Sequence, residues 1–333
     1  ACILELSKQY LSAFPFQDFF QNNNQSVLFT NKEAATKQFT IILNAHLDVV
    51  PAKAEQFEPY EKDGKLYGRG TFDMKAAAAV LLDMFKEIGP KVRYPLGLQL
   101  VTDEEIGGKV GTKYQLDQGI QAKFAIVGEP TKFNIVNQSN GRIILNLISY
   151  GTASHSAYPW LGENAIWKMN NALAELMRYF PPPLEESNST TINIAQIETT
   201  NDIPNQVPDN CTTHLDIRST PDEHLSIVEK ITKILPAEID IQHIHSSIPH
   251  QTRENNPYIL TLKEISENIL QKDIALKTAH GTSDLRFYTA KGYPGVEFGP
   301  MGGGHHGDNE WVDIQSLKDY AAILKQFLLS IEV

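Results

Sequence analysis

The sequence predicts an α/β protein with a mixed central sheet flanked by helices and a smaller α+β domain inserted into it. Short apolar runs that lead to polar residues, such as 41–43 before His46, are typical of strands that present functional groups at their carboxyl ends. The alanine-rich block from Ala76 predicts a helix packed closely on a sheet. Between residues 143 and 244 the expected order becomes β-α-β-β-α-β, the ferredoxin-like arrangement.

The remaining elements follow from hydrophobic periodicity and turn residues. In the first domain we expect helices at 3–14, 76–88, 112–118, 256–270, 283–290 and 314–330, and extended segments at 19–20, 27–29, 41–44, 98–102, 124–127 and 295–298. In the inserted domain we expect strands at 143–150, 191–198, 211–218 and 238–244, and helices at 164–179 and 223–235. We therefore expect a discontinuous first domain, residues 1–139 and 250–333, and an inserted domain, residues 140–249.

Composition excludes several classes of function. A chain of 333 residues with 41% apolar content can bury a large core, and its length favours two domains. The net charge of −11 argues against nucleic-acid or anionic-membrane binding. We find no membrane-spanning apolar run and no signal segment. Cys2 and Cys211 give neither a disulfide framework nor a thiolate zinc motif, which suits a reducing, cytoplasmic compartment. The chain begins at Ala1 without a methionine, so a trimmed or processed start is expected.

Residues able to bind a metal recur at the ends of four expected strands. The strands at 41–44, 98–102, 124–127 and 295–298 are followed by His46, by Asp103, Glu104 and Glu105, by Glu129, and by His305 and His306. Asp73 precedes the helix at Ala76. A single His or Asp in such a place is more often an ordinary polar residue or a helix cap. Four such strand ends together predict one metal site, since imidazole and carboxylate can share an ion.

Several motifs occur in one order along nearly the whole chain. They are HLDVVP from His46, GRGTFDMK from Gly68, TDEEIGG from Thr102, GEPT from Gly128, GTSD from Gly281, and HHGDNE ending at Glu310. Together they resemble the M20 family of metallopeptidases, in particular the branch of acetylornithine deacetylase and succinyl-diaminopimelate desuccinylase. The resemblance implies a zinc-hydrolase catalytic domain, an inserted lid and dimerisation domain, and a role in amino-acid biosynthesis. The acetylornithine branch lacks GTSD, which favours the desuccinylase-like deacylases.

The resemblance also implies the ligands of a two-metal site. Asp73 matches the aspartate that bridges both ions, with His46 and Glu129 on one ion and Glu105 and His306 on the other. Zinc accepts this mixture and leaves a position for water, and one or two zinc ions are expected, with cobalt or manganese as alternatives.

The choice between His305 and His306 also comes from the family pattern. The family places an Asn-Glu pair so that the Glu stands four residues after the ligand histidine. Asn309 and Glu310 fit His306, which leaves His305 outside the expected ligand set.

Two acidic residues are expected to support the chemistry. Asp48 lies two residues after His46, so in a strand both side chains point to the same side. Its carboxylate is expected to hold the imidazole, although a surface Asp at a turn is the alternative. Glu104 and Glu105 point apart in an extended segment, so only one should bind metal. The residues alone leave the choice open, and the resemblance makes Glu104 the general base. Asp103 is expected to be structural.

The inserted domain carries one expected catalytic residue. His155 matches a family histidine that reaches the active site of the partner subunit and stabilises the oxyanion, which implies a homodimer formed through the inserted domains. An exposed loop histidine is the alternative.

The expected substrate contacts also follow from the resemblance. Gly281, Thr282 and Ser283 resemble the desuccinylase loop that holds the substrate carboxylate. Asn205 and Arg218 match substrate-binding positions of the inserted domain, and Arg218 suits bidentate carboxylate binding. Arg218 at a strand end is alternatively a surface residue.

These expectations define a hydrolase that cleaves the amide of an N-acyl amino acid. Water activated by the ions attacks the acyl carbonyl while Glu104 transfers the proton and His155 stabilises the oxyanion. A dipeptidase or aminopeptidase is the alternative within enzymes, because the same core hydrolyses peptide bonds. A catalytically inactive binding protein is the alternative from another class, and it predicts missing ligands or a missing base, all of which are present.

Overall fold

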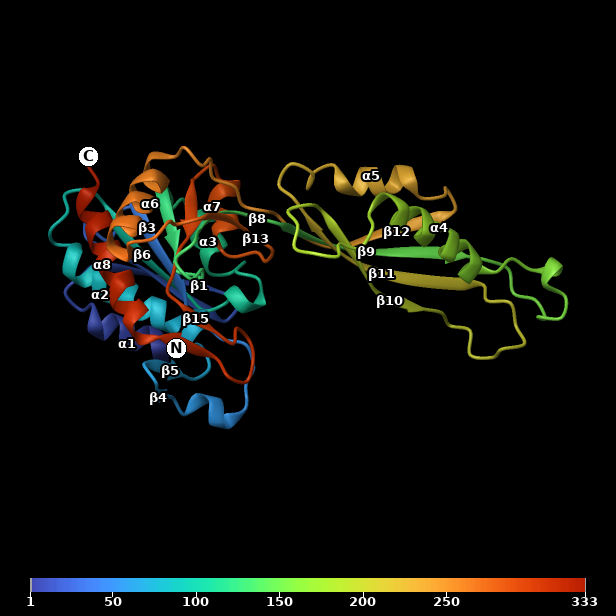
Figure 1. The fold of residues 1–333 in the computed structure, drawn as a ribbon, viewed down its shortest axis with the longest axis horizontal. Helices are drawn as coiled ribbons and strands as arrows, with labels where there is room; N and C mark the ends of the chain where they lie inside the picture. The colour runs from blue at the N-terminus through green and yellow to red at the C-terminus, as the bar shows by residue number, and fades with distance from the viewer. Residues whose placement is uncertain (1, 333) are drawn as a thin grey trace. The chain divides into compact units, whose positions relative to one another are not determined.

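The computed structural model describes residues 2–332, which form two compact units (Figure 1). Of the described residues, the first unit comprises 2–138, 251–277 and 283–332, and the second comprises 139–250 and 278–282. The short segment 278–282 therefore groups with the second unit, although both of its flanks belong to the first. Each unit has a hydrophobic core of its own.

The first unit is built on an eight-stranded sheet in the order β1-β2-β6-β3-β7-β14-β8-β13. The strands are β1 (Phe16–Gln21), β2 (Asn24–Thr30), β3 (Gln38–His46), β6 (Leu96–Val101), β7 (Gln121–Val127), β8 (Ile135–Ser139), β13 (Leu276–Ala279) and β14 (Gly295–Glu297). Strands β6, β3, β7 and β14 are parallel, whereas β1–β2, β2–β6 and β14–β8 pair antiparallel. The predicted mixed sheet is confirmed, and the carboxyl ends of four strands meet at one edge.

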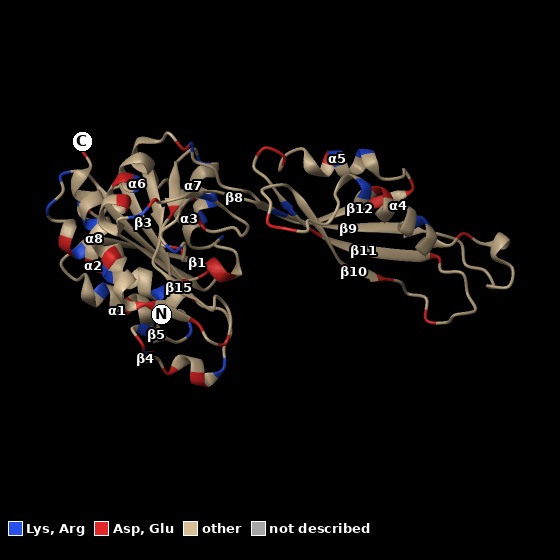
Figure 2. Cartoon of the chain, viewed as in Figure 1, with Lys and Arg blue, Asp and Glu red and all other residues tan. Residues whose placement is uncertain are grey.

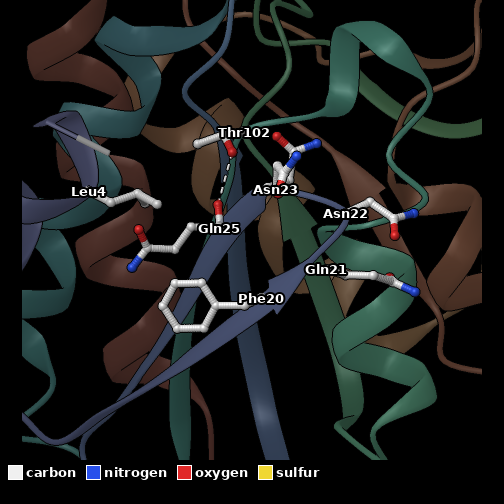
Figure 3. A pocket seen from close by; sticks show the side chains of 8 residues that line it. Leu4, Phe20, Gln21, Asn22, Asn23, Gln25 and Thr102 are labelled. Atoms are coloured by element: carbon white, nitrogen blue, oxygen red, sulfur yellow. Dashed lines mark hydrogen bonds between the residues drawn. The ribbon is translucent and has the colours of Figure 1, made fainter.

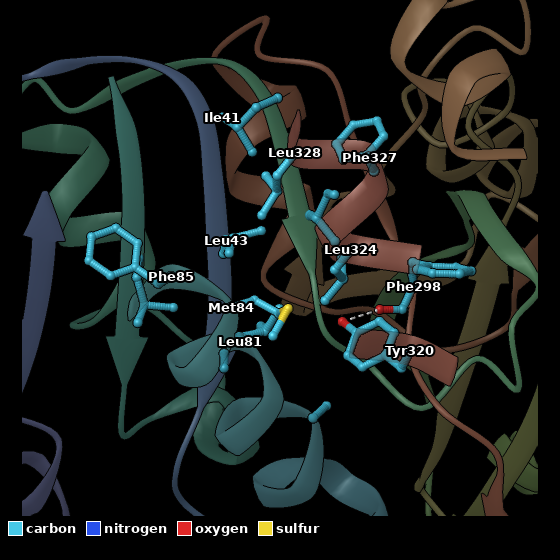
Figure 4. Close-up of a cluster of buried hydrophobic side chains, with 14 of the residues drawn as sticks. Ile41, Leu43, Leu81, Met84, Phe85, Phe298, Tyr320, Leu324, Phe327 and Leu328 are labelled. Atoms are coloured by element: carbon cyan, nitrogen blue, oxygen red, sulfur yellow. Dashed lines mark hydrogen bonds between the residues drawn. The ribbon is translucent and has the colours of Figure 1, made fainter. Parts of the chain in front are cut away.

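Helices cover both faces of this sheet. They are α1 (Cys2–Tyr10), α2 (Ala76–Ile88), α3 (Thr112–Asp117), α6 (Pro257–Leu270), α7 (Leu285–Ala290) and α8 (Ile314–Ser330). Because side chains alternate along a strand, Ile41 and Leu43 of β3 join the core with α2 and α8, whereas Ile42 joins a second cluster with α3 and α7. Figure 4 shows the first of these cores, in which the Tyr320 hydroxyl donates to the carbonyl of Phe298 (2.8 Å). Burying each large apolar side chain stabilises the fold by about 1.5–3 kcal/mol. Packing of this core therefore holds the parallel strands, and the residues at their carboxyl ends, in place.

A second, small sheet joins two segments that are distant in the sequence. Its order is β15-β16-β5-β4, with β4 (Tyr60–Lys62), β5 (Lys65–Tyr67), β15 (Gly302–Gly303) and β16 (Trp311–Asp313). A tight hairpin at Asp63 and Gly64, both with positive φ, connects β4 to β5. The pairing of β16 with β5 holds the chain after residue 302 beside the chain that leads to Asp73. These strands were not predicted, because two or three residues carry no periodic pattern.

Most predicted elements of the first unit are confirmed, and α2 and α8 have the predicted bounds. Helix α1 ends at Tyr10 rather than at residue 14, and residues 11–13 form a turn ahead of Pro15. Strands β8 and β13 were missed. Both lie at one side of the sheet, where β13 is the edge strand and only partly buried.

The second unit has the predicted ferredoxin-like order. Its elements are β9 (Gly141–Tyr150), α4 (Ala165–Tyr179), β10 (Thr191–Glu198), β11 (Asn210–Ser219), α5 (Ile227–Ile234) and β12 (Ile239–Ser247). All its strands pair antiparallel in the order β10-β11-β9-β12, which leaves β10 at an edge. Alternate residues of β9 and β11 are buried, and they form a core with α4 and α5. Helix α5 is shorter than predicted because residues 221–226 form turns.

Acidic and basic residues are interspersed along the elements of both units (Figure 2). The acidic excess, a net charge of −11, opposes binding to a phosphate backbone. Between residues 2 and 332 we find no helix that is both long and apolar enough to cross a membrane.

Candidate metal centre

The candidate site lies at the carboxyl edge of the parallel strands. His46 is the last residue of β3, and its register partner Val101 is the last residue of β6. Glu104 and Glu105 form a single 3₁₀ turn after β6, and Glu129 follows β7 by two residues. Parallel pairing therefore brings together side chains that are up to 83 residues apart in the sequence.

Asp73 is the centre of this cluster. One carboxylate oxygen, Oδ1, lies 3.0 Å from His46 Nε2. The other, Oδ2, lies 2.6 Å from His305 Nε2 and 3.1 Å from His306 Nε2. His306 Nε2 is also 3.3 Å from Glu105 Oε1. Asp73 thus belongs to two groups of potential metal ligands, one with His305 and His306 and one with His46 and Glu105.

Two carboxylates of the cluster have acceptor atoms without donors. Within residues 2–332, Glu105 Oε1 and Glu129 Oε1 are buried and accept no hydrogen bond of good geometry, although an ion-pair contact of 3.3 Å joins Glu105 Oε1 to His306 Nε2. Burial, followed by the charge of Asp73, raises the pKa of both groups. Unpartnered buried acceptors are costly, and a cation would satisfy them. The residues present therefore fit a site for divalent metal ions.

The imidazoles balance the charge of Asp73. Burial alone would raise the pKa of Asp73, but hydrogen bonds from His305, His306 and His46 outweigh burial and lower it. Burial alone would lower the pKa of His46, but contacts with Asp48 and Asp73 raise it. The carboxylate is therefore ionised, with three imidazole nitrogens within 3.1 Å of its oxygens, and metal binding would require these nitrogens to give up their protons.

A buried ion pair fixes the segment that carries Asp73. Glu310 Oε2 accepts hydrogen bonds from Arg69 Nη1 (2.6 Å) and from the Gly70 amide (3.0 Å). Glu310 Oε1 accepts hydrogen bonds from the amides of Phe72 (2.9 Å) and Asp73 (3.0 Å). Arg69 Nη2 also donates to the carbonyl of His306 (3.2 Å). The two loops that meet at Asp73 Oδ2 are thus joined.

Asp48 connects His46 to the acidic turn. Its carboxylate accepts the amide N–H of Glu105 (3.0 Å) and of Glu104 (3.3 Å). Its carboxylate lies 3.5 Å from His46 Nδ1, whereas its backbone carbonyl lies closer, at 3.1 Å. The backbone carbonyl of Asp48 is therefore its main contact with the His46 imidazole. The Asp48 carboxylate instead holds the backbone of the turn that carries Glu104 and Glu105.

Glu104 has surroundings different from those of Glu105. It belongs to neither group of potential ligands within the described part of the chain. Burial, followed by the charge of Asp284, raises its pKa to about 8. The Arg286 guanidinium lies 4.0 Å from its carboxylate and is fixed by the carbonyls of Ser283 (2.6 Å) and Gly107 (2.8 Å). Glu104 is therefore a carboxylate set beside the cluster, with a pKa suited to proton transfer at neutral pH.

The loop with the GTSD sequence belongs to both units. Gly281 and Thr282 group with the second unit, and Ser283 with the first. The Ser283 hydroxyl is buried and donates to Glu297 Oε1 (2.5 Å). Its single hydroxyl hydrogen is therefore already used within the protein.

The other predicted residues lie in the second unit. His155 is exposed, and its Nδ1 accepts the amide N–H of Ala157 (3.0 Å). A bridge between His155 and Gln206 holds its loop beside the one that carries exposed Asn205. Arg218 Nε donates to Asp216 Oδ1 (2.9 Å), so part of its guanidinium is engaged within the protein.

The cavity at the β1–β2 hairpin is distinct from this cluster. Its volume is about 400 Å³, and its lining residues are Leu4, Phe20, Gln21, Asn22, Asn23, Asn24, Gln25 and Thr102 (Figure 3). Thr102 Oγ1 donates to the carbonyl of Gln25 (2.8 Å). Because no predicted site residue lines it, this cavity does not identify the reactive centre.

Three features of the site could not be predicted from the sequence. Arg69 appeared only as part of a motif and Glu310 only as a spacing mark for His306, and their pairing depends on a contact across 241 residues. The position of Arg286 beside Glu104 likewise depends on tertiary structure. The approach of His305 to Asp73 follows from the backbone at His306, which has a φ of 57°. The available sequence signal for the Arg69–Glu310 pair was the charged residue that each of the GRG and HHGDNE motifs contributes.

A mixed sheet whose parallel strands gather imidazoles and carboxylates around one aspartate at their carboxyl ends is the architecture of a metal-dependent α/β hydrolase. The chain belongs to peptidase family M20/M25/M40, whose family model matches residues 42–330. The resemblance read from the motifs is thus confirmed.

Curated relatives are similar over most of the chain. A succinyl-diaminopimelate desuccinylase of Helicobacter pylori (strain ATCC 700392 / 26695) is 30% identical over 315 residues, covering 88% of this chain and 80% of the relative. A succinyl-diaminopimelate desuccinylase of Buchnera aphidicola subsp. Acyrthosiphon pisum (strain APS) is 30% identical over 322 residues, covering 87% of this chain and 84% of the relative.

Solved structures share the fold. Aminopeptidase PepT of Bacillus cereus ATCC 10987 has a TM-score of 0.82 at 20% identity and covers 98% of this chain and 92% of its own. A dinuclear metal binding peptidase of the M20 family from Bacillus subtilis has a TM-score of 0.72 at 13% identity, and the match covers 98% of this chain and 92% of the peptidase. At these identities the likeness concerns the fold alone.

The Glu310–Arg69 pair yields a prediction for stability. Glu310→Ala leaves a buried guanidinium and three amides without their acceptor, and breaking a buried pair in this way costs about 3–5 kcal/mol. Urea unfolding of the metal-free protein measures the loss. Asp308→Ala is the matched control, because it breaks an exposed pair with Lys53 (2.6 Å) and should cost less than about 1 kcal/mol. Equal losses in the two variants would contradict the prediction.

Proposed function

We propose that this protein is a zinc-dependent hydrolase that cleaves the amide bond of an N-acyl amino acid. The observation that carries the proposal is the position of Asp73, whose two oxygens face separate imidazoles beside the carboxylates of Glu105 and Glu129, and Glu129 Oε1 is buried without a hydrogen-bond partner. The curated relatives named above are desuccinylases, which supports a deacylase.

In this proposal five residues would hold two divalent ions. Asp73 would be shared by the ions, with His46 and Glu129 as further ligands of one and Glu105 and His306 as further ligands of the other. Bound zinc supplies an activated water and a Lewis acid, and cobalt or manganese could replace it. The carbonyl of Asp48 holds the His46 ring, and its carboxylate holds the backbone of the acidic turn.

Glu104 is the general base of the proposed reaction. It adjoins the ligand Glu105 but stands outside both ligand groups, so its carboxylate is not assigned to an ion. It takes the proton from the attacking water and returns it to the leaving nitrogen, which departs as the amine. Arg286, itself held by two carbonyls, lies 4.0 Å from the Glu104 carboxylate, and its positive charge favours the ionised form of Glu104 that accepts a proton.

His155 is the proposed oxyanion donor, supplied by the second subunit of a homodimer. Because Nδ1 accepts a hydrogen bond from Ala157, the neutral ring carries its proton on Nε2, which is then free to donate. The edge strand β10 and the exposed side chains of Trp160 and Trp167 are features that a second copy could cover. Asn205, Gly281 and Thr282 are proposed to contact the substrate.

Cleavage of dipeptides or of peptide N-termini is the second candidate function. A succinyl group carries a carboxylate that needs a cationic or hydroxyl partner. Arg218 is partly engaged by Asp216, and the Ser283 hydroxyl by Glu297, which weakens two expected contacts with such a group. The similar solved structures named above are peptidases, which agrees with this candidate.

A substrate panel tests the proposal. We expect the zinc-loaded protein to release amine from at least one of N-succinyl-diaminopimelate, N-acetylornithine and N-acetylcitrulline, measured by an amine assay. A chelator should abolish the release and added zinc should restore it, because the ions activate the water. Two plain dipeptides complete the panel. Cleavage of the dipeptides alone would overturn the deacylase proposal in favour of the peptidase.

Replacement of Glu104 tests the base. Glu104→Gln should lower turnover by about 10²- to 10⁴-fold, the usual contribution of a general base, while metal content and melting temperature stay unchanged. Glu105→Gln is the contrasting variant, since loss of a ligand should lower metal content. Turnover near that of the wild type in Glu104→Gln would exclude this base.

Complementation tests the role of His155 in the partner's site. His155→Ala alone should lower turnover by about 10²- to 10³-fold without loss of metal, as removal of an oxyanion donor does. Co-expression of His155→Ala with Glu104→Gln chains should restore about a quarter of wild-type activity, because half of the dimers then hold one intact site. Failure to restore activity in mixed dimers would show that His155 does not act across subunits.

A further inference from the structure

Two consecutive histidines point at the same oxygen atom. In an extended segment the side chains of His305 and His306 would diverge. His306 instead has a φ of 57°, in the left-handed region, and the two ring centroids are 4.3 Å apart. Both Nε2 atoms consequently approach Asp73 Oδ2, at 2.6 and 3.1 Å.

This geometry fits ligands of one ion. Ligand atoms around a tetrahedral zinc with bonds of about 2.0 Å lie about 3.3 Å apart. His306 Nε2 has this spacing to Asp73 (3.1 Å) and to Glu105 (3.3 Å). His305 Nε2 is closer to Asp73, but its side chain is 52% exposed, so an outward shift of the ring can bring it to ligand distance.

We propose that His305 is a further metal ligand, on the side of Asp73 that faces Glu105 and His306. The inference rests on the two-ion site of the proposed function. With His305 that side offers two imidazoles and two carboxylates, whereas the opposite side offers His46 with Asp73 and Glu129. Imidazole favours zinc, cobalt and nickel over magnesium and manganese. The side with two imidazoles therefore binds its ion first and more tightly.

A cobalt(II) titration of the metal-free protein tests this order. Calorimetry gives the affinity of each step, and the visible absorption of cobalt reports its ligands. The wild type should take up two ions in two steps of different affinity. His305→Ala should weaken cobalt binding in the first step by about 10- to 100-fold and should change the absorption spectrum of the cobalt bound in that step. Loss of a residue that only supports a ligand already weakens metal binding by this factor, so loss of a ligand should do so at least as much. His46→Ala should instead weaken the second step.

Two controls accompany the titration. His243→Ala removes an exposed histidine of β12 and should leave both steps unchanged. His305→Gln keeps a polar side chain but offers no imidazole, so it should behave like His305→Ala. The melting temperature of each metal-free variant verifies that it is folded.

Unchanged affinities and spectrum in both His305 variants would overturn the proposal, as would uptake of a single ion by the wild type. The titration needs no substrate, so it separates two failures. A wild type that binds two ions in the expected order but cleaves no member of the panel overturns the proposed function alone. Catalysis with normal metal uptake in His305→Ala overturns the role of His305 alone.

Discussion

The geometry of the candidate site depends on the buried carboxylate of Glu310. A buried ion pair is favourable only when further hydrogen bonds satisfy the remaining polar atoms. Glu310 accepts one hydrogen bond from Arg69 and three from backbone amides, which matches the roughly four lone-pair sites of a carboxylate. Arg69 also donates to the His306 carbonyl. Through Arg69, Glu310 therefore sets the separation of the two loops that carry Asp73 and the histidine pair, although Glu310 itself lies outside the ligand cluster.

The parallel strands supply the rest of the geometry. Their apolar side chains hold β3, β6 and β7 in register, and the polar residues at their ends inherit that alignment. Asp48 then couples the end of β3 to the turn after β6 through two backbone amides. The cluster is thus positioned by core packing and by backbone hydrogen bonds, so its side chains are free to approach one another and to bind ions.

The sequence predicted the parts of this protein that have a periodic or recurrent pattern. The four parallel strands were predictable from short continuous apolar runs that lead to polar residues, and the ferredoxin-like order from the periods of its strands and helices. The left-handed backbone at His306, which brings His305 to Asp73, has no such pattern. Nor do the contacts that engage Ser283 and Arg218, because each depends on a partner placed by the fold. The roles of the individual site residues remain predictions.

The small sheet also bears on how the chain becomes functional during synthesis. Strand β5 ends at residue 67, but its partner β16 begins at residue 311. During translation the amino-terminal part of the chain folds first. Strand β5 and the segment that carries Asp73 therefore lack the pairing with β16 until almost the whole chain has left the ribosome. Contacts of such long sequence separation form late and slowly. Because β14 and α8 also lie near the end of the chain, a nascent chain can complete its sheet core and the support of Asp73 only together, once almost all of its residues have been made.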